Sequence, residues 1–319
     1  MDVFYFILQQ TWYFAIPLLV VALGGLFSER SGVVNIALEG MMIMGAFASI
    51  LFINIVQKSE SNITGQNLLI LAVLIAGTTG ALFSVLHAFS SITMKANQVI
   101  SGTALNLFAP AFAIFIARTM YNVMQIQFIN VFRIKEVPVL SRIPIFGKIF
   151  FTNMYLTTII GIVILIVTIF VMNKTRFGLR LKACGENPQA ADSVGINVYR
   201  IRYVSVIISG FLAGIGGLIF VLPTSTEFSG TVAGYGFLAL AVLIFGKWRP
   251  VRILFAALFF GLMKTISASY SIIPLLSNLG LHSNIYKMVP FVATLIVLAF
   301  SSKSSNVPKA SGEPYEKGS

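Results

Sequence analysis

Two polar residues enter a long apolar run near the start of the chain. Asn35 and Glu39 lie four positions apart in the stretch SGVVNIALEGMM, residues 31–42. A helix would place them on one face. Because ionisable groups within a membrane span are costly, they usually face a cavity, a partner or a solute path. We predict a polar pathway at Asn35 and Glu39. The alternative is that Glu39 lies at the interface, neutral or paired with Arg30, and only orients helices.

A third polar residue, Asn106, is alone in an apolar stretch. It either binds a solute or bonds a neighbouring helix. The chain has few residues suited to covalent catalysis or metal binding. Cys184 is the only cysteine, and His87 and His282 are far apart in sequence. An enzyme would need clustered His, Asp or Cys, and no cluster is visible in the sequence. The chain also lacks the Gly-x-x-x-x-Gly-Lys-Ser/Thr pattern that cradles ATP phosphates, so it must borrow its energy from elsewhere.

A long polar segment, residues 177–196, interrupts the apolar pattern. Asn187 is a favourable N-cap and Pro188 suits the first helical position, which predicts a short helix running toward Gly195. Small apolar side chains on this helix, Ala190, Ala191 and Val194, form a face that could dock in a groove of a motor subunit. A capped connector helix with no partner is the other interpretation.

The elements that position these residues are membrane spans. Hydrophobic residues make up 57% of the chain and charged residues 10%, and the mean hydropathy is +0.91. Soluble domains average about 25% charged residues, and a span needs about 20 apolar residues. We predict an all-α transmembrane bundle of about nine spans in one domain, residues 1–302. The predicted spans are 5–27, 36–56, 67–91, 98–120, 153–172, 201–222, 232–247, 250–266 and 284–302.

Two of these spans, 232–247 and 250–266, are short, so they are tilted, re-entrant or a tight hairpin. Within 201–222, small-residue spacing predicts close helix contact at Gly210, Gly214, Gly216 and Gly217. The first span is expected to stay in the mature protein, because no basic residue precedes it.

Basic residues set the orientation, because they concentrate in cytoplasmic loops. They are concentrated in the segment 173–200, which we predict to be cytoplasmic. Membrane orientation therefore explains the net charge of +12 better than binding to nucleic acid would. The segment 118–152 then lies outside, as a lid, a re-entrant turn or an ordinary surface connection. The polar segment 303–319 carries little apolar surface, so we expect a disordered cytoplasmic tail.

Four stretches together carry a family resemblance. The sequence GENPQAA followed by Gly195 and Ile196 resembles the cytoplasmic coupling signature of bacterial ABC importer permeases that serve simple sugars, nucleosides and branched-chain amino acids. The stretches GVVNIALEG, GTALNL and GYGFLALAV also match that family, in order along the chain. The resemblance implies that an ATPase contacts the loop at Gly185, Glu186, Asn187, Pro188, Ala190, Ala191, Val194 and Gly195.

The wording of the first stretch is more similar to nucleoside permeases than to ribose permeases, which usually carry an acidic residue at the position of Asn35. The resemblance implies a multi-pass subunit of the bacterial plasma membrane that translocates nucleosides and is not itself an enzyme. Its partners would be an ATPase that consumes ATP, a second homologous permease, an external binding lipoprotein and membrane lipid, with no nucleic acid. The chain itself would bind no cofactor and no metal. A simple sugar, a branched-chain amino acid, or ion-coupled transport without an ATPase are the alternatives.

Overall fold

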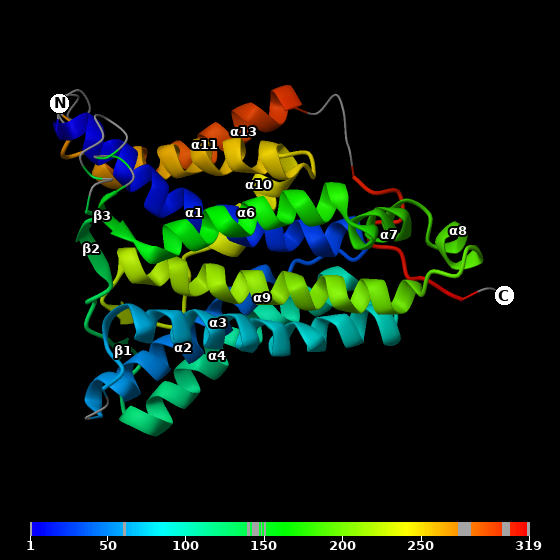
Figure 1. Ribbon diagram of the computed structural model, residues 1–319, viewed down its shortest axis with the longest axis horizontal. Helices are drawn as coiled ribbons and strands as arrows, with labels where there is room; N and C mark the ends of the chain where they lie inside the picture. The colour runs from blue at the N-terminus through cyan, green and yellow to red at the C-terminus, as the bar shows by residue number, and fades with distance from the viewer. Residues whose placement is uncertain are drawn as a thin grey trace.

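The computed structural model describes residues 2–59, 62–138, 141, 147, 149, 151–273, 282–301 and 307–317. Its long helices lie side by side along the longest axis of the molecule (Figure 1). Seven of them, among the described residues, are long and apolar enough to cross a membrane. They are α1 (Asp2–Arg30), α2 (Leu38–Lys58), α3 (Gly65–Ala88) with its π-helical extension η1 (Phe89–Thr93), α4 (Gln98–Tyr121), α6 (Leu156–Lys174), α9 (Val198–Thr224) and α11 (Pro250–Ser269).

The helical membrane bundle is confirmed, but the structure shows seven candidate spans where about nine were predicted. The predicted span 232–247 contains only α10 (Tyr235–Phe245), whose 11 residues cover about 16 Å. That is roughly half of a 30 Å hydrocarbon core. The last predicted span, 284–302, coincides with α13 (Ser283–Ser301), a helix of 19 residues. A re-entrant segment is not shown.

The centre of the bundle is α9, which packs against α1, α2 and α3. Close approach depends on glycines, as predicted from their spacing. A Cβ on Gly214 would lie 2.1 Å from the carbonyl oxygen of Ala76 on α3, and one on Gly45 of α2 would lie 2.3 Å from the Cα of Gly214. A Cβ on Gly217 would lie 2.1 Å from the oxygen of Met42. Backbones in direct contact of this kind are typical of membrane helix packing.

One end of the bundle carries two small antiparallel sheets (Figure 1). Strand β1 (Ile126–Gln127) pairs with β4 (Glu227–Phe228), and β2 (Arg133–Glu136) pairs with β3 (Thr152–Tyr155). The segment 118–152, predicted as a lid, a re-entrant turn or a surface connection, therefore contributes β1, β2 and the first residue of β3. Its residues 139, 140, 142–146, 148 and 150 lie outside the described residues. We call the end of the bundle that carries the two sheets the strand end.

The opposite end carries α7 (Arg176–Glu186), α8 (Pro188–Ser193) and the tail, residues 307–317 (Figure 1). The prediction of a disordered segment 303–319 is wrong for the tail. The amides of Ala310 and Gly312 donate to the oxygens of Gly185 and Gly32 at 2.9 and 3.0 Å. Tyr315 is buried against the α7–α8 region. Composition counts the apolar surface of the tail alone, and it misses the acceptors that the bundle offers.

Candidate functional site: a junction of broken helices

The chain between α1 and α2, residues 31–37, is not helical although most of it is buried. Backbone groups buried in a membrane protein need internal partners. Side chains from other helices supply them here. Gln98 accepts a hydrogen bond from the Val34 amide at 2.7 Å, and a ring nitrogen of His87 lies 3.0 Å from the Val34 oxygen. Arg202 donates to the oxygen of Ser31 at 3.2 Å.

Asn106 connects α4 to the start of α2. Its Oδ1 accepts a hydrogen bond from the amide of Gly40 at 2.7 Å, and its Nδ2 donates to the oxygen of Ile36 at 2.8 Å. The Gly40 amide is one of the first in α2, where amides lack intrahelical partners. Asn106 therefore satisfies a donor and an acceptor that the broken backbone exposes. Of the two interpretations from the sequence, these contacts favour the helix-bonding one.

Glu39 connects the start of α2 to the start of α10. Its two carboxylate oxygens accept hydrogen bonds from the amides of Gly234 and Gly236 at 2.9 and 2.6 Å. A carboxylate is stabilised at a helix N-terminus by the free amides and the positive end of the helix dipole. The contact is tight, because a Cβ on Gly236 would lie 2.4 Å from the amide nitrogen of Glu39. The ion pair with Arg30 is not seen; Arg30 lies 3.8 Å from Glu186 instead.

Asn35 is fully buried, and its Nδ2 donates to the Ser209 hydroxyl of α9 at 2.9 Å. Its Oδ1 has no hydrogen-bond partner among the described residues. The prediction that one helix face presents Asn35 and Glu39 is wrong, because α2 begins only at Leu38. The structure nevertheless brings Asn35, Glu39 and Asn106 to one place. We call these three residues, with Gly234 and Gly236, the junction.

Several polar residues of this region were missed in the sequence analysis. His87, Gln98, Ser209 and Arg202 are each less than 9% exposed. The signal was available, since each is a polar residue within or at the end of an apolar run, as Asn106 is. What the sequence does not show is the partner of each side chain, which lies in the remote, non-helical segment 31–37.

The α7–α8 region has a different character, because much of its surface is exposed. Asn187 caps α8 as predicted, its Oδ1 accepting from the Ala190 amide at 3.0 Å, and Pro188 occupies the first turn. Ala190 is exposed and Val194 is 74% exposed. Ala191 is only 3% exposed and faces inward. Its place on a docking face is therefore a wrong prediction.

The inward side of α8 packs against the chain itself. Ala191, Cys184, Val198 and Tyr315 form one buried apolar cluster. Burial raises the pKa of the Cys184 thiol. Between residues 185 and 195 the exposed residues are Glu186, Asn187, Gln189, Ala190, Ser193, Val194 and Gly195, and we call them the α8 surface.

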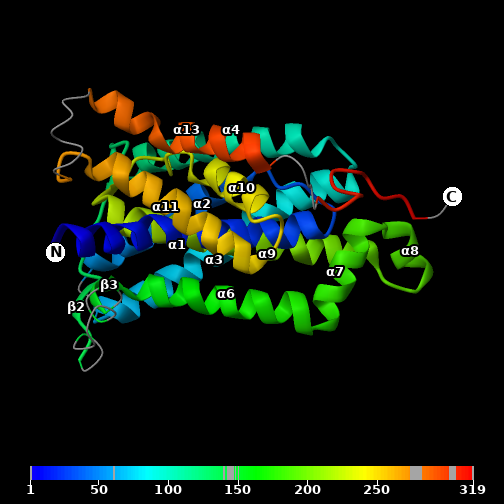
Figure 2. The same cartoon turned by 90° about the horizontal axis from the view of Figure 1, so that it is seen from above.

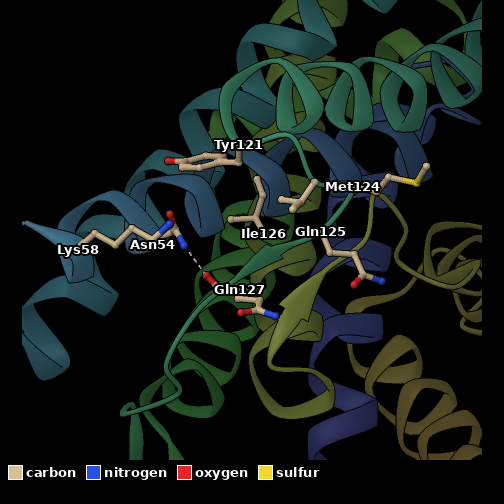
Figure 3. Close-up of a pocket in the computed structure, with 8 residues that line it drawn as sticks. Asn54, Lys58, Tyr121, Met124, Gln125, Ile126 and Gln127 are labelled. Carbon is tan, nitrogen blue, oxygen red and sulfur yellow. Dashed lines mark hydrogen bonds between the residues drawn. The ribbon is translucent and has the colours of Figure 1, made fainter.

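A cavity of about 640 Å³, lined by both polar and apolar side chains, opens at the strand end, between α2, α4 and β1 (Figure 3). Asn54 donates to the Gln127 oxygen at 2.6 Å, and its own Oδ1 has no partner among the described residues. The Lys58 ammonium lies 4.6 Å from the centre of the Tyr121 ring. The volume falls in the range of small-molecule sites, about 300–1,000 Å³. Nothing in the sequence analysis pointed to this cavity, because its walls come from separate elements.

Comparisons with known proteins fit this architecture. The chain is 43% identical to the guanosine ABC transporter permease protein NupQ of Bacillus subtilis, over 98% of the chain and 97% of the relative. It is 42% identical to the nucleoside ABC transporter permease protein NupC of Lactococcus lactis, over 95% and 94%. It is 25% identical to a second Bacillus subtilis protein, the guanosine ABC transporter permease protein NupP, over 95% and 82%.

No solved structure is significantly similar to the chain. The profile of the family described as "Branched-chain amino acid transport system / permease component" matches residues 7–299. With its multi-pass helical bundle, the chain therefore belongs to this family of ABC transporter permeases, as a membrane-spanning transport subunit and not an enzyme.

Proposed function

We propose that the chain is the permease subunit of an ATP-driven importer for nucleosides. The observation that carries the proposal is 43% identity, over 98% of the chain, to a permease named for guanosine. The absence of a phosphate-binding loop in the sequence agrees with energy supplied by a separate ATPase subunit. The cavity at the strand end, with its amides and one aromatic ring, offers hydrogen bonds and a flat apolar surface suited to a nucleoside.

We further propose that Asn35, Glu39 and Asn106 position the solute pathway and do not bind the solute directly. Their hydrogen bonds go largely to this chain's own backbone or side chains. In transporters, discontinuous helices commonly form the solute site, so residues that hold such helices together determine the shape of the pathway. In this proposal α10 enters only half of the membrane, α13 is a further span, and residues 1–302 form one transmembrane domain.

The α8 surface is our proposed contact with the ATPase. It is exposed, it contains the small side chain Ala190, and the Asn187 cap fixes the helix that carries it. This assignment places the α7–α8 end, with residues 173–200 and the tail, in the cytoplasm. The proposed assembly also contains a second homologous permease, for which NupP is a precedent, and an external binding lipoprotein.

The test is uptake by the complete complex in sealed vesicles. We expect accumulation of labelled guanosine when ATP is present on the α8 side, and none with a non-hydrolysable analogue. Leucine and ribose, offered at the same concentration with their own binding proteins absent, are not expected to accumulate. Guanosine uptake by this chain alone, driven by a proton or sodium gradient, would instead support a secondary transporter.

A further inference from the structure

A second cavity, of about 580 Å³, lies at the α7–α8 end and gathers positive charge. It is formed by the ends of α1 and α6, by α7, and by the start of α11. Four of its lining residues are cations: Arg30 of α1, Lys182 of α7, Arg249 just before α11, and Arg252 of α11. None of them belongs to the junction or the α8 surface.

Two of the cations donate hydrogen bonds to backbone oxygens, which carry no net charge. Arg30 donates to the oxygen of Trp248 at 3.0 Å, and Lys182 donates to the oxygen of Met172 at 2.7 Å. Burial, and then the nearby charge of Arg30, lower the pKa of Lys182. An anion in the cavity would relieve both the burial cost and the repulsion between the cations.

Negative charge is scarce around the cavity. Among the described residues, the four cations make a single ion pair, that of Arg30 with Glu186 at 3.8 Å, and the Glu186 side chain is 49% exposed. Glu29 lies nearby, but its carboxylate accepts the indole N–H of Trp248 at 2.6 Å. The first turn of α11 also lines the cavity, and its free amides and the positive end of the helix dipole favour a bound anion.

The flanks of the cavity are apolar and exposed. Helices α6 and α11 lie on either side of α1 (Figure 2), and both pack against it. On α11, Val251 lines the cavity and is 50% exposed, and Phe255 one turn further is 65% exposed. On α6, Ile166 and Phe170 are 61% and 60% exposed. A free phosphate ion has no apolar part that could contact these side chains, whereas the acyl chains of a lipid would cover them.

We propose that this cavity binds the phosphate headgroup of an anionic phospholipid, with its acyl chains along α6 and α11. Basic pockets between helices at the level of the headgroups have the chemistry for this. Lys182 and Arg252 are the cations we expect to contact the phosphate from opposite walls. The site would tie the end of α6 and α7 to the start of α11 through a lipid. It does not depend on the solute that is transported.

The test is photocrosslinking in the intact complex. Vesicles contain phosphatidylcholine and a fraction of phosphatidylglycerol that carries a photoreactive acyl chain, and crosslinked peptides are identified by mass spectrometry. We expect labelling on α6 and α11, which falls about fivefold for each cation removed in Lys182→Gln and Arg252→Gln. The control is Arg176→Gln with Arg200→Gln, which removes two exposed cations that do not line the cavity.

Three outcomes would overturn the proposal. The first is equal labelling by photoreactive phosphatidylcholine, which carries no net charge. The second is displacement of the label by excess inorganic phosphate, which would mean that a free anion occupies the cavity. The third is unchanged labelling in the double variant Lys182→Gln with Arg252→Gln, together with loss of the ATPase subunit on purification. This result would mean that the cations of the cavity contact a protein partner.

Discussion

The junction and the α8 surface both contain polar residues that the sequence marks as unusual, yet the structure uses them in opposite ways. At the junction, Glu39 and Asn106 are buried and bond to backbone groups where helices are broken. On the α8 surface, Glu186 and Gln189 are exposed. A polar residue within a membrane domain can therefore replace missing backbone hydrogen bonds, and it need not contact the solute. A polar residue outside the membrane is free to meet a partner.

The largest effect is expected from Gly236→Ala at the junction. The added Cβ would lie 2.4 Å from the amide nitrogen and 2.5 Å from the Cα of Glu39. Both atoms belong to backbone, so the starts of α2 and α10 must separate. Overpacking usually costs about 1–3 kcal/mol, and we expect the upper end of that range. Thermal unfolding of the complex measures it. Phe237→Ala, at the next residue, which is 51% exposed, is the control and should change the midpoint little.

A smaller effect is expected from removing one charge in each region. Glu39→Gln leaves one of the two amides, of Gly234 or Gly236, facing a donor. An unsatisfied buried donor costs about 1–3 kcal/mol, and transport should fall with it. Glu186→Gln makes the same chemical change on an exposed side chain and should stay within about 0.5 kcal/mol. Equal unfolding midpoints for the two variants would contradict the claim that Glu39 stabilises the fold and Glu186 does not.

The tail gives a local effect that the single cysteine can report. Tyr315 is 5% exposed and covers Cys184, which is fully buried. Burial also raises the pKa of the thiol, so little thiolate forms near neutral pH and maleimide labelling should be slow. Tyr315→Ala removes apolar contact worth about 1.5–3 kcal/mol, which corresponds to roughly tenfold or more in exposure of the thiol. Labelling at an unchanged rate would mean that the tail does not cover Cys184.

Much of the bundle could be predicted, because long apolar runs must span a membrane. The ends of α2 and α4 lie within a few residues of their predicted positions. The non-helical backbone just before α10 could not be predicted, because hydropathy does not report backbone conformation, and residues 232–234 were included in the predicted span. Asn35, Glu39 and Asn106 stood out as polar residues in apolar runs. Their partners could not be found this way, since Gly234 and Ser209 are remote in sequence.

The inward position of Ala191 was missed for a related reason. Helical periodicity placed Ala190, Ala191 and Val194 on one small apolar face. It could not show that Tyr315, from the far end of the chain, covers part of that face. The docking prediction therefore narrows to Ala190 and Val194, and Ala190 is the better position for a test because it is small and exposed.

The most direct test of the account is retention of the ATPase subunit by Ala190→Glu. The permease itself should stay folded, with a change within about 0.5 kcal/mol, because surface substitutions are usually tolerated. A charge without a partner in a desolvated contact is costly, so the ATPase should be lost when the complex is purified through the permease. Ala96→Glu, the same change at another exposed position of the same end, should retain it. Full retention of an ATPase with normal stimulation by Ala190→Glu would contradict the assignment of the α8 surface.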